Sequence, residues 1–416
     1  MEQVSSNYGL DLISKSGTYW VRSNNFLSWA RVESKEGARD WNTQVTLEQE
    51  LKDASSHGLD VILVVRQTPS WAQSIDGYAC SPVKVEKIEP FAKFLHDAVA
   101  RYSVPPYNVK YWEIWNEPDI DYRLVDPNND WGCWGNQDDP YYGGGYYARV
   151  LQSIYPQVKS ANPQAQVLVG GLLMDCDSNN PPTGKDCLPS KFLEGILSFG
   201  GGAYFDGVSF HAYDYYANSA GKYGNLNWNS SFSTGPVLVA KSRFISHLLQ
   251  AYGHADKFVI NTESALICGS TGKEPVCLTQ EFESTKASYA VQAYASAMAE
   301  GLWGNLWYSV LGWRASGLIN SENRNPLPVF EAYQFIAKEL REARFARSIQ
   351  DYPGIQVYEF NRKGQRVWVL WSLDGAARTL QPASPPQFIF DIFGAAIPTK
   401  NSITVSGMPI YLEWNP

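Results

Sequence analysis

Apolar runs and amphipathic stretches alternate along most of the chain. The run from Leu59 to Arg66 is nearly continuous and rich in β-branched residues, which is typical of a parallel strand covered on both faces. From residue 85 to 102, apolar residues recur at spacings of three and four, which predicts a helix. The alternation continues, and its order favours a parallel (β/α)8 TIM barrel. Further strands are predicted at residues 110–117, 166–171, 208–213, 257–263 and 305–309, and further helices at residues 146–161, 191–199, 237–252 and 282–300.

After about residue 346, apolar residues recur at every second position instead. This period predicts short antiparallel strands, the first two of which flank the turn Arg362-Lys363-Gly364. We therefore predict a (β/α)8 barrel over residues 1–345 and a small C-terminal β-sandwich over residues 346–416. Its tryptophans are expected to pack in the core, with a separate carbohydrate-binding role as the alternative. The strands are predicted at residues 355–360, 366–373, 387–393, 402–405 and 409–414, and the tryptophans are Trp368, Trp371 and Trp414.

The N-terminus leaves little room for the first strand of a barrel. Only Met1 to Ser5 precedes the first predicted helix, Tyr8 to Lys15, so we expect strand 1 to be short or trimmed. Met1 to Ser6 has no signal-peptide character, and no apolar stretch is long enough to span a membrane. We expect that a signal peptide has been removed from this chain.

Composition and charge favour a large enzyme with a neutral partner. The chain has 416 residues, of which 44% are hydrophobic and 18% charged, so it can bury one large core and a smaller one. A net charge of −8 provides no basic surface for nucleic acid and no polybasic patch for a membrane. Aromatic residues make up 14% of the chain, and those between Trp131 and Tyr147 are difficult to assign to a core. Flat rings with a polar edge stack well on the C–H faces of sugars.

All six cysteines lie in predicted loops after strands. Two pairs each bracket a single loop, so local disulfides are the simple proposal, and the remaining pair would join the loops after strands 3 and 4. An even number of loop cysteines favours secretion into an oxidising compartment. Metal binding by these thiols is not expected, since no CxxC pair or His–Cys cluster is present. The proposed pairs are Cys176 with Cys187, Cys268 with Cys277, and Cys80 with Cys133.

Two predicted strands end on a glutamate. The strand at residues 110–117 ends on Asn116-Glu117 before a proline, and the strand at residues 257–263 ends on Glu263. Parallel strands of a barrel present their reactive side chains at one rim. Cleavage of a glycosidic bond needs one carboxyl to protonate the leaving oxygen and one carboxylate to stabilise the anomeric carbon. The two glutamates therefore predict a glycosidase.

The segment Trp115-Asn116-Glu117-Pro118 resembles the acid/base signature of the clan A glycoside hydrolases, which are retaining (β/α)8 enzymes. The resemblance covers residues 18 to 345 approximately and assigns Glu117 as acid/base and Glu263 as nucleophile. Within the clan, Tyr19-Trp20-Val21-Arg22 and the segment Gly312-Trp313-Arg314 are most similar to family 39 and its unassigned bacterial relatives.

The resemblance also implies substrate-contacting residues around the two carboxyls. Each has a structural alternative, such as a core histidine, an ion pair or simple packing. An inward arginine on the second strand could also hold the nucleophile ionised. Glu113 has the parity of Glu117 and is expected at most to support it. The implied residues are Asn116, His211, Tyr213, Arg22, Trp313 and Trp71.

The expected reaction is hydrolysis of β-linked oligo- or polysaccharides by double displacement, with no metal or organic cofactor. Exo action, as in β-xylosidases of family 39, is favoured. Endo-acting glucanase, mannanase or xylanase activity is the alternative, and transglycosylation would use the same residues. No basic cluster is apparent near the strand ends, which argues against uronic acid sugars. A non-catalytic carbohydrate-binding protein is the alternative of another class.

Overall fold

The computed structural model describes residues 9–228, 235–399 and 402–415. The chain divides into two compact units. The first contains Tyr19–His211 and Arg243–Glu263 together with residues up to Leu10, and the second contains Asp11–Thr18, Ala212–Ser242 and Ser264–Pro416. The predicted domain boundary between residues 345 and 346 stays a prediction.

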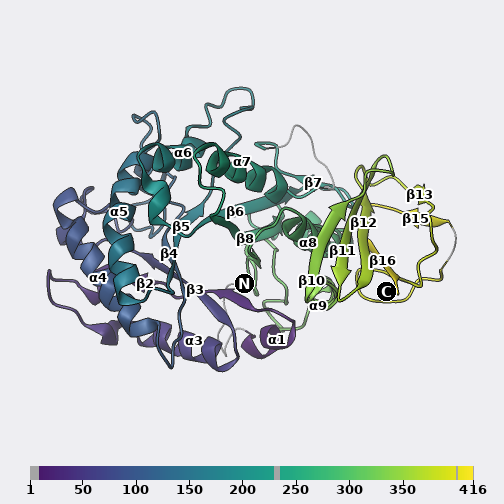
Figure 1. Ribbon diagram of the computed structural model, residues 1–416, viewed down its shortest axis with the longest axis horizontal. Coiled ribbons are helices and arrows are strands. Elements are labelled where there is room, and N and C mark those ends of the chain that lie inside the picture. The colour runs from purple at the N-terminus through teal and green to yellow at the C-terminus, as the bar shows by residue number, and fades with distance from the viewer. Residues whose placement is uncertain (1–8, 229–234, 400–401, 416) are drawn as a thin grey trace. The chain divides into compact units, whose positions relative to one another are not determined.

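A parallel sheet with helical connections runs through the chain, and this is the architecture of the predicted (β/α)8 barrel (Figure 1). Its order is β1-β3-β4-β5-β6-β8-β9, with β2 paired to β3 and β7 paired to β6. Strand β9 belongs to the second unit, and β6 and β8 pass from the first into the second. The strand 1 predicted at Met1 to Ser5 lies outside the described residues. The bounds are β1 Trp20–Arg22, β2 Leu27–Ser28, β3 Asp60–Arg66, β4 Tyr111–Asn116, β5 Gln166–Leu172, β6 Gly207–Tyr216, β7 Tyr223–Gly224, β8 Phe258–Ile267 and β9 Asn305–Trp307.

The predicted helices form within a few residues of their expected bounds. Residues of α4 at spacings of three and four, including Phe91 and Leu95, are fully buried, as the pattern predicted. Helices α4 and α5 pack against each other, and α5 also packs against α6 (Figure 1). Helix α8 begins where the Thr279 hydroxyl accepts the Phe282 N–H at 3.2 Å. The bounds are α1 Leu10–Lys15, α2 Trp29–Val32, α3 Val45–Ser56, α4 Ile88–Tyr102, α5 Gly144–Ala161, α6 Lys191–Ser198, α7 Leu238–Ala251, α8 Gln280–Ala299 and α9 Pro328–Leu340.

Two strands are longer than the sequence predicted. The apolar run was expected to stop at Glu263, but β8 continues to Ile267 and is buried through its last residue. Strand β6 similarly continues past Tyr213, where the predicted strand ended, to Tyr216. The polar residues around Glu263 looked like a strand end, yet every residue from Val259 to Ile267 is buried.

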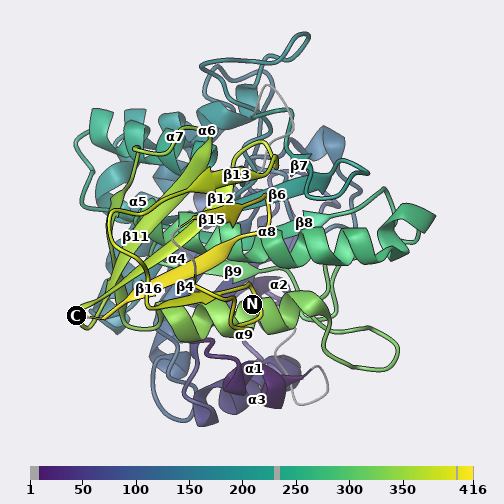
Figure 2. The same ribbon diagram turned by 90° about the vertical axis from the view of Figure 1, so that its right-hand side faces the viewer.

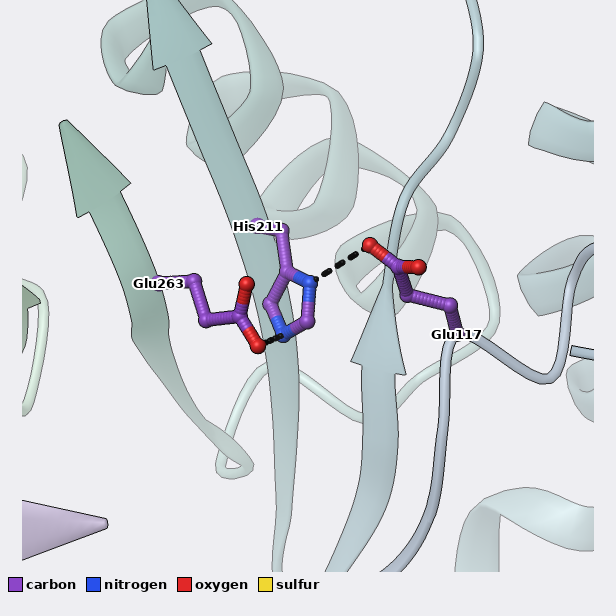
Figure 3. Close-up of side chains that lie close together, drawn as sticks. All are labelled: Glu117, His211 and Glu263. Carbon is purple, nitrogen blue, oxygen red and sulfur yellow. Dashed lines mark hydrogen bonds and ion pairs between the residues drawn. The ribbon is translucent and has the colours of Figure 1, made fainter. Parts of the chain in front are cut away.

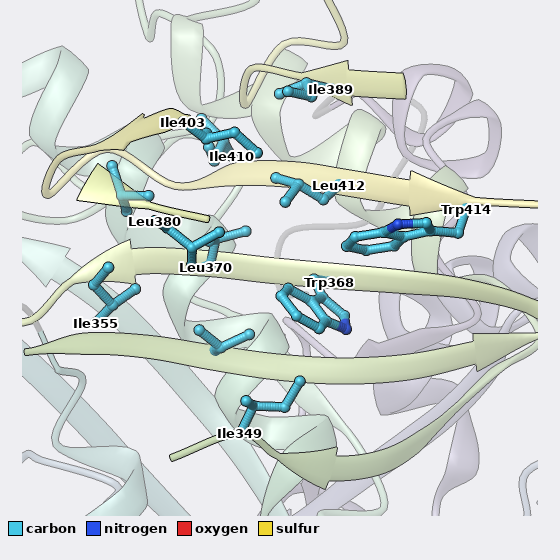
Figure 4. Close-up of a cluster of buried hydrophobic side chains, with 12 residues drawn as sticks. Ile349, Ile355, Trp368, Leu370, Leu380, Ile389, Ile403, Ile410, Leu412 and Trp414 are labelled. Atoms are coloured by element: carbon cyan, nitrogen blue, oxygen red, sulfur yellow. The ribbon is translucent and has the colours of Figure 1, made fainter. Parts of the chain in front are cut away.

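The C-terminal region forms antiparallel sheets, as the period of two predicted. Five strands pair in the order β10-β11-β12-β16-β14, and β13 pairs with β15. Strands β11, β12, β13, β15 and β16 are labelled in Figure 2. A hydrophobic cluster that includes Trp368, Leu370, Leu412 and Trp414 is buried against them, so these two tryptophans pack in a core (Figure 4). Strands β10 and β13 were not predicted. The bounds are β10 Ala343–Ser348, β11 Ile355–Arg362, β12 Gln365–Ser372, β13 Arg378–Leu380, β14 Phe388–Phe390, β15 Ile403–Val405 and β16 Ile410–Trp414.

None of the helices among the described residues is long and apolar enough to cross a membrane.

Candidate active site

Glu117, His211 and Glu263 lie together, and the imidazole ring stands between the two carboxyl groups (Figure 3). Nδ1 of His211 lies 2.9 Å from Oε1 of Glu117, and Nε2 lies 3.4 Å from Oε1 of Glu263. One oxygen of each glutamate and one ring nitrogen lie within 4.8 Å of one another. Glu117 follows β4, whereas the other two residues lie on β6 and β8. Three segments distant in sequence thus bring these side chains to one point.

A glycine on β5 creates the space for the histidine. A Cβ atom at Gly171 would overlap Nε2 of His211, so a larger residue would displace the imidazole ring. The carbonyl of Gly171 also accepts the backbone N–H of Glu117 at 3.0 Å. Glu117 has a φ of 49°, in the left-handed region that non-glycine residues rarely adopt. This bond fixes the turn that carries Glu117.

Asp119 joins the loop after β4 to the loop after β5. Its buried carboxylate accepts the backbone N–H groups of Leu173 at 3.0 Å and Met174 at 2.7 Å. Buried backbone donors need acceptors, and a carboxylate makes these bonds stronger than neutral ones. The sequence interpretation did not single out this residue, which lies directly after Glu117-Pro118.

Arg22 on β1 holds three side chains at once. Its Nη1 donates to Oε1 of Glu263 at 2.6 Å, and its Nη2 donates to Oε1 of Glu113 at 2.5 Å and to the amide oxygen of Asn116. Arg22 and both carboxylates are buried, so this cation offsets the cost of burying them. Arg22 was predicted to contact substrate, and the structure adds that its donors serve protein groups. Glu113 was expected at most to support Glu117; in the structure its carboxylate bonds to Arg22, and support of Glu117 stays a prediction.

Tyr213 and Trp313 are neighbours in the second unit. Their ring centroids lie 5.8 Å apart at an interplanar angle of 76°, and Tyr308 lies 6.0 Å from Tyr213. Tyr213 is 9% exposed, whereas Trp313 is 48% exposed. About half of the Trp313 side chain is therefore open to solvent, as a sugar-stacking residue would need.

Other aromatic candidates are used for packing. The indole N–H of Trp71 donates to the carbonyl of Glu33 at 2.9 Å, and its ring packs edge-on against Trp29. A substrate contact of Trp71 stays a prediction. The six aromatics between Trp131 and Tyr147 were difficult to assign to a core, and three of them are buried. Those buried are Trp134, Tyr142 and Tyr147, and Trp134 packs against Trp115 and Tyr147.

The six cysteines form three disulfides in the pairs that the sequence suggested. Cys80 is joined to Cys133, which links the loops after β3 and β4. The other two bonds each close a single loop, after β5 and after β8. Disulfides restrict the unfolded chain and stabilise the loops that they close. These two are Cys176–Cys187 and Cys268–Cys277.

Glu117, His211 and Glu263 are also a donor set that a metal ion could use. Arg22 already places a positive charge 2.6 Å from Oε1 of Glu263, and this charge would oppose a cation there. The charge of Arg22 therefore disfavours a metal ion beside Glu263. The absence of a cofactor stays a prediction.

Solved structures with a similar fold include glycoside hydrolases. One is a family 39 glycoside hydrolase from the gut symbiont Bacteroides cellulosilyticus, with 20% identity and a TM-score of 0.68 over 97% of this chain and 76% of that chain. A GH30 endoxylanase from Clostridium papyrosolvens has 14% identity and a TM-score of 0.59 over 99% of this chain and 93% of that chain. A monomeric β-xylosidase from Caulobacter crescentus has 13% identity and a TM-score of 0.59 over 99% of this chain and 92% of that chain.

No family model matches the chain, and no curated protein matches it. At these identities the likeness to solved structures shows the fold, and it confirms the predicted barrel. A family 39 enzyme is among the neighbours, as the sequence resemblance led us to expect.

Proposed function

We propose that this protein is a retaining glycoside hydrolase that cleaves β-linked oligo- or polysaccharides. The observation that carries the proposal is the pairing of Glu117 and Glu263 across His211, with one oxygen of each within 4.8 Å of the other. Retaining glycosidases have carboxyl groups about 5 to 5.5 Å apart, and inverting ones about 6.5 to 9.5 Å apart. The short separation supports the retaining mechanism.

In the proposed reaction, Glu263 attacks the anomeric carbon while the bond to the departing oxygen breaks. Glu117 gives its proton to that oxygen, and a covalent glycosyl-enzyme forms. Glu117 then takes a proton from water, which attacks the anomeric carbon and releases Glu263 as a carboxylate. Arg22 would hold Glu263 ionised and oriented, because its Nη1 lies 2.6 Å from the reacting carboxylate.

For substrate, we propose exo action on β-linked sugars, in the manner of a β-xylosidase. The β-xylosidase among the structural neighbours supports this choice, and the endoxylanase among them keeps endo action as the alternative. The three disulfides support secretion into an oxidising compartment.

The test is a panel of aryl α- and β-glycosides and undecorated polysaccharides, with the length of the products measured. Single sugars released from aryl β-glycosides would establish exo action. Oligosaccharides released from a polymer, without cleavage of aryl glycosides, would establish endo action. Binding without turnover of any member would overturn the proposal in favour of a carbohydrate-binding protein.

The residue assignments have a separate test. Glu263→Ala should lose activity by several orders of magnitude, and azide should restore turnover with an α-azide product. Azide rescue of Glu117→Ala should give a β-azide instead. Glu331→Ala is the matched control, because Glu331 is exposed on α9 and should leave the rate unchanged. Near-normal rates in both site variants would show that the carboxyl pair is wrong.

A further inference from the structure

The loop after β9 presents an arginine that lies against two exposed aromatic rings. The guanidinium carbon of Arg314 lies 5.2 Å from the ring centroid of Trp313 and 5.6 Å from that of Tyr215. Trp313 is 48% exposed and Tyr215 is 40% exposed. Contacts with ring faces use the flat surface of a guanidinium and leave its N–H edges available as donors.

This loop is held rigidly from several sides. The buried ammonium of Lys286 donates to the carbonyls of Ala315 at 2.8 Å and Gly317 at 3.1 Å. The N–H of Cys268, at the base of a disulfide-closed loop, donates to the carbonyl of Arg314 at 3.0 Å. Trp307 donates its indole N–H to the carbonyl of Ser316 at 2.8 Å. The backbone that carries Arg314 is therefore held in place before any ligand arrives.

The backbone of the loop is in an unfavourable conformation at the arginine itself. Arg314 has a φ of 50° and Ala315 a φ of 64°, so two successive non-glycine residues adopt the left-handed region. Such conformations persist only where surrounding bonds impose them, and they concentrate at ligand-binding sites. The bonds from Lys286 and Cys268 impose this one.

Arg314 lacks an acidic partner in the part of the chain that the structure describes. No carboxylate lies within ion-pair distance of it there, and its Nε atom is buried without a hydrogen-bond acceptor. This is unexpected in a chain with 42 acidic and 34 basic residues. Buried donors are normally paired, and an unpaired one calls for an explanation such as a missing ligand.

We propose that Trp313, Arg314 and Tyr215 form a subsite for a sugar unit that carries a carboxylate, that is, a uronic acid. The aromatic faces would stack on the C–H faces of the glycan, and the guanidinium edge would bind the carboxylate through two parallel N–H···O bonds. The inference rests on the proposed function in taking the ligand to be a glycan. It departs from the sequence expectation of a neutral substrate, which was based on the lack of a basic cluster; one oriented arginine is enough.

The experiment measures binding rather than turnover. Xylo-oligosaccharides that carry a glucuronic acid unit, and oligoglucuronates, are titrated calorimetrically into the Glu263→Gln protein. Each is compared with the same oligosaccharide after its carboxyl groups have been reduced to alcohols. Charge-assisted bonds to a carboxylate predict that one of the acidic forms binds about tenfold more tightly or better than its reduced form. Arg314→Gln should remove this preference, and Arg314→Lys should keep only part of it, because lysine lacks the planar fork.

Arg324→Gln is the matched control, since Arg324 is an exposed loop arginine of the same unit. It removes the same charge and should keep the preference. Equal affinity for the acidic and reduced forms, or a preference that survives Arg314→Gln, would overturn the proposal. Stronger binding of sulfated oligosaccharides than of uronates would overturn the carboxylate assignment. If Arg314→Gln fails to fold, the comparison of acidic and reduced ligands and the Trp313→Ala variant still decide.

Failure of the proposed function gives a different result. The protein would then hydrolyse no glycoside, while the preference for the acidic oligosaccharide and its dependence on Arg314 would remain.

Discussion

Two buried glutamates share one arginine where α9 meets the C-terminal sheet. Nη1 of Arg362 lies 2.5 Å from Oε2 of Glu339, and Nη2 lies 3.1 Å from Oε1 of Glu413. Both glutamate side chains are 6% exposed. Burial, followed by the hydrogen bond with Glu413 and its charge, raises the pKa of Glu339 from 4.5 to about 7, although Arg362 opposes the shift. Below about pH 7, one proton therefore stays on this pair.

The sign of the effect on stability follows from this raised pKa. Between pH 4.5 and about 7 the folded protein holds a proton on Glu339 that the unfolded chain has lost. The free energy of unfolding should therefore be highest below pH 4.5 as far as this group is concerned, and should fall as the pH rises through 7. A pKa shift is worth about 1.4 kcal/mol per unit, so the shift of Glu339 corresponds to about 3 kcal/mol of unfolding free energy. Because the proton is shared with Glu413, we expect roughly 2 kcal/mol.

Glu339→Gln removes the titrating group and keeps its shape. The free energy of unfolding is measured with urea at pH 5 and at pH 9. Between these two pH values it should fall by about 2 kcal/mol more for the wild type than for the variant. At pH 9 the free energy of unfolding of the variant should equal or exceed that of the wild type, because the wild type then has two carboxylates on one arginine. Glu331→Gln on the exposed face of the same helix should leave the pH dependence unchanged. Parallel stability curves for the wild type and Glu339→Gln would refute the reasoning.

Three further predictions concern the candidate site and the loops. Arg22→Gln should lower kcat/KM on an aryl glycoside about 100-fold or more and should also destabilise the protein, because it leaves Glu113 and Glu263 without their buried cation. A loss of only about tenfold in kcat/KM would argue against this role of Arg22. Gly171→Ala should reduce activity severely by displacing His211 while the far-ultraviolet circular dichroism stays native. Peptide mapping without reduction should recover three linked cysteine pairs, and free thiols throughout would contradict the proposed compartment.

The barrel and the central residues of the candidate site could be predicted from the sequence for one reason. Parallel strands covered on both faces give long apolar runs, and the ends of such strands share one edge of the sheet. Glu117, His211 and Glu263 each lie on or directly after such a run, so their proximity followed from strand order. Parity predicted that Glu113 shares a face with Glu117, whereas its bond to Arg22 could be recognised only in the structure.

Loop aromatics show where this reasoning stops. Trp134 and Tyr147 lie in or next to a polar, glycine-rich loop, which made them look available to a sugar. In the structure Trp134 packs against Trp115 and Tyr147 and is 4% exposed. Burial under a loop depends on contacts between distant segments, and no local period records it. The predicted strand at residues 257–263 was shorter than β8 for a related reason, because the buried polar residues of β8 looked like the start of a loop.

The residues that position the candidate site have no reactive role of their own, and for this reason they are hard to recognise in a single sequence. Gly171 leaves space for the His211 ring, and Asp119 ties two loops by accepting backbone N–H groups. In sequence, a strand glycine equally indicates a bulge, and an aspartate after a proline equally indicates a helix cap. Only the register of neighbouring strands shows what each one faces. Activity should therefore depend on both positions although neither is proposed to take part in bond cleavage, and a search for function by residue type alone would miss them.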